Sequence, residues 1–193
     1  MNSIFFNFIN PYLSFIDSGK IYRQPFSLLY TLLAALNILF PLYVFYVAVD
    51  NNIFDAGAKF IIVFLLSWLI IAFAGWVGFQ IWWDRKSKVS QIPTNNDGFV
   101  ATPVFSHFIQ TAGEWMGTWI AIVGFGVALL TTFILGDEAR FFIRATGLGF
   151  LGTGFLSIFL MPVYGFLVIV GSRCLAELFR AVAAIANNTR RSV

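Results

Sequence analysis

The feature that most constrains this chain is a set of four long windows that contain no Asp, Glu, Lys, Arg or His. The windows cover residues 24–49, 60–83, 115–136 and 145–172. Each exceeds the ~20 residues that an α-helix needs to cross a hydrocarbon core about 30 Å thick. Because lipid offers no hydrogen-bond partners, the backbone groups of such a window must bond within their own helix. The windows therefore predict an all-α integral membrane four-helix bundle.

Basic residues are distributed unevenly between these windows. Nine of the 12 Lys and Arg residues lie before the first window, between the second and third, or after the fourth. Only Lys59, Arg140 and Arg144 lie on the opposite side. The positive-inside rule then predicts that both termini and the middle loop are cytoplasmic, in a bacterial inner membrane. The same asymmetry accounts for the net charge of +3 without a nucleic-acid partner.

The N-terminal segment, residues 2–17, differs from a membrane span. Its apolar residues recur at helical spacing with Asn residues between them. This pattern predicts an amphipathic helix on the inner leaflet, which Pro11 breaks or kinks; an irregular aromatic leader is the alternative. The start lacks the basic residues of a signal peptide, so we expect the N-terminus to be retained.

A phrase in the first half of the chain recurs in the second. "FIDSGKIY" begins at Phe15 and "FIQTAGEW" at Phe108, an offset of 93 residues. The same offset aligns "VGFQIWWDRKSKVSQI" with "VGSRCLAELFRAVAAI" at the far end of each half. We interpret residues 1–92 and 93–193 as two parallel hairpin repeats; chance similarity between two apolar stretches is the alternative.

Each end of the chain carries a short motif. The first is "FFNFINPYLSFID", and the last is "RCLAELFRAVAAIANN" with Arg173 and Glu177. They resemble an uncharacterised bacterial family of short two-span membrane hairpins, here duplicated. That family has no assigned activity, so the resemblance implies a hairpin fold and no catalytic residue.

Small residues recur at every fourth position in the third and fourth windows. They are Gly113, Gly117 and Ala121 on one stripe, Gly124, Ala128 and Thr132 on a second, and Ala145, Gly149, Thr153 and Ser157 in the fourth window. Small side chains allow membrane helices to approach closely. We predict that these stripes are helix-packing surfaces, within the chain or between subunits. The alternative is that Gly is simply frequent in membrane helices.

Other residues inside the windows have predicted structural roles. Asn37 is expected to donate a hydrogen bond across helices. Pro41 and Pro162 are expected to bend their helices, either as hinges or as static features that shape the bundle.

The last helix is predicted to extend beyond the membrane into the cytoplasm. Between Arg144 and Ala186 only Pro162 interrupts helical character, which at ~1.5 Å per residue gives about 64 Å. Arg173 and Arg180 are spaced to pair with Glu177. The cytoplasmic part carries an apolar stripe that must be buried against the equivalent segment near Val89 and Ile92, a neighbouring subunit or another protein. The residues of the stripe are Leu175, Leu178, Phe179, Val182 and Ile185.

Two groups of polar residues are candidates for a site. His107, Thr111 and Glu114 share one helix face and suit a proton or ion site, although polar residues are also common at the membrane interface. Four carboxylates fall in the outer loops, where they form either a cation-attracting mouth or ordinary loop charges. These four are Asp50, Asp55, Asp137 and Glu138.

No motif for catalysis, phosphate binding, zinc or haem is present, and we expect no cofactor. One His and one Cys, Cys174, are too few ligands for a His/Cys metal site. Cys174 is expected to be inert, with lipidation as an alternative. We therefore predict a non-enzymatic structural or accessory subunit that forms a homo-oligomer or joins a larger membrane complex. An oligomeric ion channel is the alternative.

Overall fold

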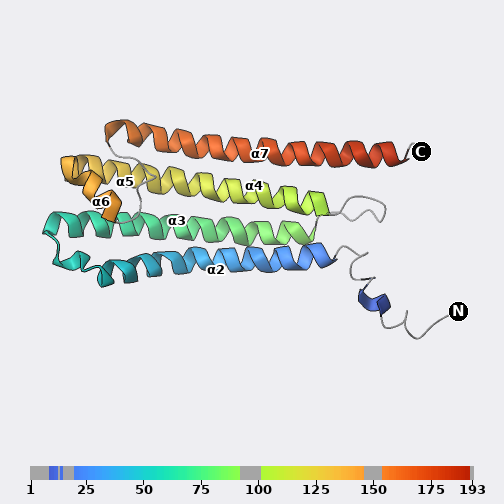
Figure 1. Cartoon of the computed structure of the whole chain (residues 1–193), viewed down its shortest axis with the longest axis horizontal. Helices are drawn as coiled ribbons and strands as arrows, with labels where there is room; N and C mark the ends of the chain where they lie inside the picture. Colours follow the sequence, from blue (N-terminus) through green and yellow to red (C-terminus); the bar gives the residue numbers. More distant parts are fainter. Residues whose placement is uncertain (1–8, 13, 15–19, 92–100, 146–153, 192–193) are drawn as a thin grey trace.

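The computed structural model describes residues 9–12, 14, 20–91, 101–145 and 154–191. Within these ranges the structure is helical, and four helical segments are long and apolar enough to cross a membrane. This confirms the predicted all-α four-helix membrane architecture. The four segments are built on α2 (Lys20–Asp50), α3 (Ala58–Ser90), α4 (Ala101–Trp119) and α7 (Phe155–Arg191) (Figure 1).

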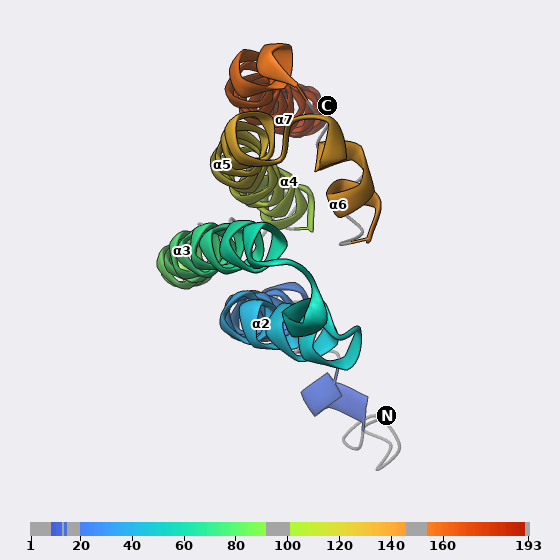
Figure 2. The same ribbon diagram turned by 90° about the vertical axis from the view of Figure 1, so that its left-hand side faces the viewer.

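The four segments lie side by side in one layer, in the order in which they follow along the chain. Seen from one end, α2, α3, α4 with α5, and α7 form a row (Figure 2). Packing is most extensive within the pairs α2–α3 and α4–α7, and α3 joins the pairs by packing on α4. As a result α2 and α7 are the edge helices, each with one principal neighbour.

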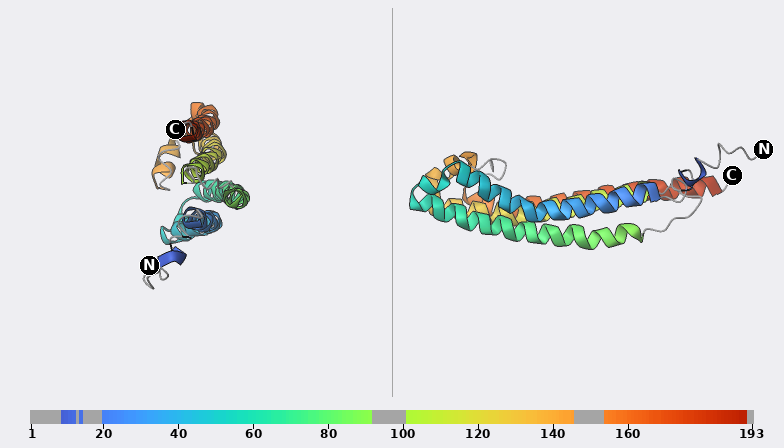
Figure 3. Two further views of the ribbon diagram at one scale, coloured as in Figure 1. Left: turned by 90° about the vertical axis from the view of Figure 1, so that its right-hand side faces the viewer. Right: turned by 90° about the horizontal axis from the view of Figure 1, so that it is seen from below.

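The ends of the row differ in their structure. Both termini lie at one end, which we call the terminal end (Figure 3). The opposite end, which we call the turn end, holds the α2–α3 turn with the 3-10 helix η1 (Ile53–Asp55), and the short helix α6 (Ala139–Ala145) (Figure 1). Asn52 begins the α2–α3 turn in the left-handed conformation, with φ of 54°, which Asn adopts more readily than most residues.

The third span is longer than its charge-free window and is not uniformly α-helical. It begins at Ala101, so the predicted polar face of His107 and Glu114 belongs to the same helix as the span. Two π-helical turns interrupt it before a 3-10 turn ends it; such turns often change the direction of side chains along a helix. The segments after α4 are η2 (Ile120–Gly124), α5 (Phe125–Leu130), η3 (Thr131–Leu135) and η4 (Gly136–Glu138).

The prediction of one helix from Arg144 to Ala186 is wrong at its start. Helix α6 ends at Ala145 and α7 begins at Phe155. Gly154 has φ of +96°, a conformation that cannot continue a right-handed helix. Ala145 and Ser157 therefore lie on different helices and not on one packing stripe; Gly149 and Thr153 lie outside the described residues. With its 37 residues, α7 is about 55 Å long.

Pro41 creates a point of close approach between α2 and α3. Proline has no N–H, so the Asn37 carbonyl one turn earlier lacks its usual helical donor. Gly75 of α3 lies against this carbonyl, and a Cβ there would come 2.5 Å from the Asn37 oxygen. One turn further along α2, the Pro41 carbonyl accepts a 2.8 Å hydrogen bond from Nε1 of Trp68. Polar backbone atoms inside the predicted span are thus used to join two helices.

Two apolar clusters fill the row. The first, toward the turn end, includes Val63 and Ile71 of α3, and Val123 and Val127 of the third span. The second, toward the terminal end, is centred on Trp82 and also contains the buried residues Tyr30, Ala34, Val89 and Val104. The second cluster surrounds the polar residues described below.

The predicted amphipathic helix over residues 2–17 falls largely outside the described residues. Of this segment the structure describes residues 9–12, which are helical, and residue 14. Ile9 and Tyr12 are both exposed. The prediction for the whole segment stays a prediction.

Candidate functional site

Glu114 is the centre of an ionic junction between three helices. Its side chain on α4 is only 9% exposed. Nη2 of Arg85, on α3, lies 2.8 Å from its Oε2. Nη2 and Nε of Arg173, on α7, donate to its Oε1 at 2.7 and 3.0 Å. One buried carboxylate thus receives two guanidinium groups from opposite sides, which is the arrangement that compensates its desolvation.

Two further α4 residues extend this junction toward the terminal end. Nε2 of Gln110 donates to Oε1 of Glu114 at 2.9 Å. The other amide atom of Gln110, Oε1, accepts a 2.6 Å hydrogen bond from Nη2 of Arg180. Nε of Arg180 also donates to Oγ of Ser106 at 3.2 Å. The junction therefore ties α7 to α4 at two levels, two helical turns apart along α7.

The Arg–Glu pairs predicted within the last helix are not formed. Arg173 pairs with Glu114 and Arg180 bonds to Gln110 and Ser106, so both guanidinium groups reach α4 instead of Glu177. The reason is geometric: the face of α7 that carries both arginines also packs on α4. A buried carboxylate on the neighbouring helix is a stronger partner than an exposed one on the same helix.

His107 and Thr111 form a second polar group, with Tyr30 of α2. The hydroxyl of the fully buried Tyr30 lies 2.8 Å from Nδ1 of His107 and 3.3 Å from Oγ1 of Thr111. Oγ1 of Thr111 donates to the His107 carbonyl at 2.8 Å. The predicted face of His107, Thr111 and Glu114 is therefore divided: the first two residues bond to α2, and Glu114 bonds to α3 and α7.

Aromatic rings pack around these polar groups. The ring of Trp82 lies 5.1 Å from that of Tyr30 and 5.9 Å from that of Trp115. Nε1 of Trp115 donates to Oδ1 of Asn37 at 2.7 Å. The role predicted for Asn37 is wrong: it accepts across helices, because its Nδ2 donates to the Leu33 carbonyl of its own helix. The hydrogen bond between Trp115 and Asn37 joins α2 to α4, although α3 lies between these two helices in the row (Figure 2).

The four carboxylates predicted in the loops lie at the turn end. Asp50 is the last residue of α2, Asp55 ends η1, and Asp137 and Glu138 lie in η4. Nζ of Lys59 lies 3.2 Å from Oε2 of Glu138 and so joins α3 to the end of the third span. Among the described residues, no three His, Cys, Asp or Glu side chains gather as metal ligands.

The first small-residue stripe lies between α4 and α7. A Cβ on Gly113 would meet the side chain of Ser172, and a Cβ on Gly117 would meet the carbonyl of Gly165. A Cβ on Gly165 would in turn come 2.9 Å from that of Ala121. The second stripe continues this contact, since a Cβ on Gly124 would come 2.8 Å from Met161. Ala128 is fully buried, whereas Thr132 has a buried hydroxyl without a partner among the described residues.

The apolar stripe predicted on the last helix divides between two faces of α7. Phe179 points toward α4, where its ring lies 6.0 Å from that of Phe105. Leu175, Leu178, Val182 and Ile185 are exposed. Ala176 and Ala183, which the sequence analysis did not single out, are the buried residues on the α4 side.

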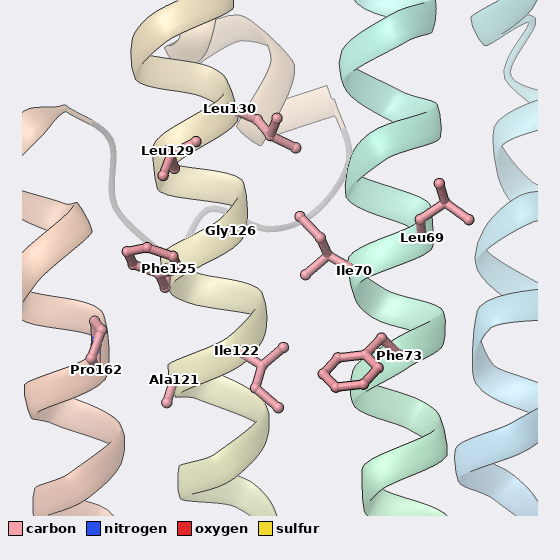
Figure 4. Close-up of a pocket in the computed structure, with 10 residues that line it drawn as sticks. All are labelled: Leu69, Ile70, Phe73, Ala121, Ile122, Phe125, Gly126, Leu129, Leu130 and Pro162. Carbon is pink, nitrogen blue, oxygen red and sulfur yellow. The ribbon is translucent and has the colours of Figure 1, made fainter.

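A lipid-facing groove runs between α3 and the third span. Its volume is about 720 Å³. Ile70 and Phe73 of α3 face Ile122 of the third span across it (Figure 4), and Leu69 and Phe125 also line it. The groove has only apolar side chains and glycine along it, so it offers no polar group to orient a solute.

Removal of one hydroxyl tests the bond between α2 and α4. We expect Tyr30→Phe to lower the free energy of unfolding by about 1 kcal/mol, because His107 and Thr111 lose a buried hydrogen-bond partner. Tyr43→Phe is the matched control, since Tyr43 lies on the same helix with a largely exposed ring. Unfolding in mixed micelles with increasing SDS measures both. Equal stability of the two variants would show that the Tyr30 hydroxyl does not join the helices.

The ionic junction and the hydrogen bonds of Tyr30 and Trp115 together join the four long helices. Glu114 connects α3, α4 and α7, and the Tyr30 and Trp115 hydrogen bonds connect α2 to α4, so all four long helices are tied together near the terminal end. The polar atoms of these contacts are paired with one another and lie among aromatic rings, which is typical of a structural network. Comparison with known proteins adds no relative: no family model, curated protein or solved structure matches this chain.

Proposed function

We propose that this protein is a non-enzymatic scaffold of a bacterial inner membrane that assembles, with itself or with other subunits, through the part of α7 beyond the membrane. The observation that carries this proposal is the length of α7 together with its surface. Its 37 residues span about 55 Å, whereas the hydrocarbon core is about 30 Å thick. The helix therefore projects about 25 Å into water at the terminal end.

Apolar side chains cover one face of this projection. Leu178, Val182 and Ile185 are each more than 60% exposed. Burying an aliphatic side chain of this size contributes about 1.5–3 kcal/mol. Contiguous exposed apolar surface outside a membrane usually marks an interaction site. The projection is therefore suited to bind a partner of similar apolar character.

The ionic junction supports the same role, because it fixes the direction of the projection. Arg173 and Arg180 hold α7 against α4 at two levels near the terminal end. A helix held this way presents its outer face in a constant orientation. The polar and ionic contacts thus make the packing of α7 on α4 rigid, which suits a scaffold.

The rival channel function needs a continuous polar surface through the membrane. The groove between the two helix pairs is lined by apolar residues and glycine, and the buried polar side chains of Tyr30, Asn37 and Glu114 bond across helices. These features favour the scaffold over a pore within one chain.

The accessibility of the projecting face tests this proposal. In a Cys174→Ser background, we expect Leu178→Cys to react slowly with maleimide in native membranes. Ala184→Cys is the control, because Ala184 is also exposed but lies off the apolar face. Protection of residue 178 relative to residue 184, lost after solubilisation, is the expected result. Equal, fast labelling of both in native membranes would contradict the scaffold proposal.

The orientation is proposed from the charge asymmetry and has its own test. We expect Asn188→Cys to be labelled only from the cytoplasmic side and Gly57→Cys only from the periplasmic side. Gly57 is suitable because a Cβ there would meet nothing within 4 Å. Impermeant maleimide on intact spheroplasts and on inverted vesicles measures this. Labelling of both positions from one side would contradict the four-span topology.

A further inference from the structure

Gly171 differs from the other glycines within the described α- and π-helices. A Cβ on each of those would meet another part of the chain at 3.0 Å or closer, so close packing accounts for them. A Cβ on Gly171 would meet nothing within 4 Å. Glycine weakens a helix relative to alanine, and nothing inside the chain requires it at this position.

Gly171 belongs to an exposed line of residues that we call the α7 stripe. The stripe runs from the membrane into the projection at heptad spacing. Its residues are Tyr164, Gly171, Leu175, Leu178, Val182 and Ile185. From Gly171 onward the steps alternate between four and three residues, which is the pattern of helices that pair along a shared seam; Tyr164 lies one heptad before Gly171. The membrane part and the projecting part thus form one continuous candidate interface.

The corresponding face of α3 shows what such a line does when a neighbour is present. Gly78 and Val89 lie 93 positions before Gly171 and Val182. A Cβ on Gly78 would meet the side chain of Asn37 on α2 and would also come 2.9 Å from Nε1 of Trp115 on α4, and Val89 is fully buried. Val182, in contrast, is 65% exposed. The difference arises because α3 has a helix on each side of it in the row, whereas α7 lies at the edge of the row (Figure 2).

The charges on α7 are arranged so that two copies can approach. Arg173 and Arg180 turn toward α4. On the flank of the stripe that faces away from α4 lie Cys174, Ala181 and Asn188, none of them charged. Two identical stripes would therefore meet without like charges facing each other across the seam.

We propose that the α7 stripe pairs with the α7 stripe of a second copy of this chain. The inference rests on the proposed scaffold function and names its partner. Two copies in one membrane share their orientation, so their α7 helices run parallel about a two-fold axis along the membrane normal. The two α7 helices approach most closely at Gly171. Beyond Gly171, in the projection, the aliphatic residues of one copy pack against those of the other.

Disulfide cross-linking tests this geometry, because parallel two-fold pairing brings each stripe residue next to its own copy. In a Cys174→Ser background, Leu178→Cys and Ile185→Cys should form covalent dimers on mild oxidation in native membranes. Ala184→Cys, exposed but off the stripe, should not. Absence of dimers at both stripe positions would overturn the pairing. If residue 178 is nevertheless protected from maleimide, a different partner covers the stripe and the scaffold function stands; if it is freely labelled, both fail.

Gly171→Leu tests the close approach separately. We expect it to reduce cross-linking of Leu178→Cys at least tenfold, because a side chain there separates the two helices. Val170→Leu is the matched control, since Val170 is also exposed but lies off the stripe. The fold of the single chain should be unaffected by Gly171→Leu, because a Cβ at this position would meet nothing within 4 Å. Undiminished cross-linking in Gly171→Leu would overturn the contact at this residue.

Discussion

Glu114→Ala is expected to lower the free energy of unfolding by about 3 kcal/mol, close to the lower limit for breaking a buried ion pair from one side. The substitution leaves Arg85 and Arg173 facing each other across the space of the lost carboxylate, to which they now lie 2.8 and 2.7 Å away. Two guanidinium groups then repel each other where one anion held them together. Unfolding in mixed micelles with increasing SDS measures the loss.

Two further variants distinguish the effect of losing the Glu114 charge from the effect of losing its side-chain volume. Glu114→Gln keeps the side-chain volume and one acceptor oxygen, so it should lower the free energy of unfolding less than Glu114→Ala does. Glu177→Ala removes an exposed carboxylate from α7 and should change stability by no more than about 0.5 kcal/mol. A loss in Glu114→Ala no larger than that in Glu177→Ala would show that the ionic junction does not hold the three helices together.

Gly117→Leu is expected to lower the free energy of unfolding by about 3 kcal/mol, the upper range for overpacking. A Cβ at this position would already meet the carbonyl of Gly165 and come 2.6 Å from Ile169. Backbone atoms cannot move aside as a flexible side chain can, so α4 and α7 must separate. The same SDS titration measures the effect, and weakened contact between α4 and α7 should also make Ser172→Cys more reactive toward maleimide.

The matched control for this variant is Gly171→Leu, on the opposite side of α7. It adds the same side chain to a glycine whose surroundings are open, and it replaces glycine in a helix by a better helix former. Measured on the single solubilised chain, its stability should equal or exceed that of the unchanged protein. If Gly117→Leu and Gly171→Leu had the same effect, the α4–α7 contact at Gly117 and Gly165 would not be the close packing described here.

The number and type of helices were predictable because the charge-free windows leave one solution in lipid. Helix ends were less predictable. The third helix extends back to Ala101 through polar residues, which cost little at a membrane interface. The last helix begins at Phe155 and not near Arg144, because the positive φ of Gly154 interrupts a right-handed helix and a hydropathy criterion does not detect such an interruption.

The site was only partly predictable, for a reason specific to membrane helices. Glu114 was recognisable as unusual, but its partners Arg85 and Arg173 lie on two other helices. Which face of a helix meets a neighbour cannot be read from hydrophobicity when lipid and protein are equally apolar. The same ambiguity hid the acceptor role of Asn37, which depends on Trp115 arriving from α4.

Native mass spectrometry of the protein, extracted gently from its own membrane, tests whether two copies of this chain pair through α7. We expect a complex with at least two copies of this chain, and loss of the second copy when Leu178 and Val182 are both replaced by Ser. A protein released only as a single copy, with lipid and no other subunit, under conditions that preserve known membrane oligomers, would contradict it.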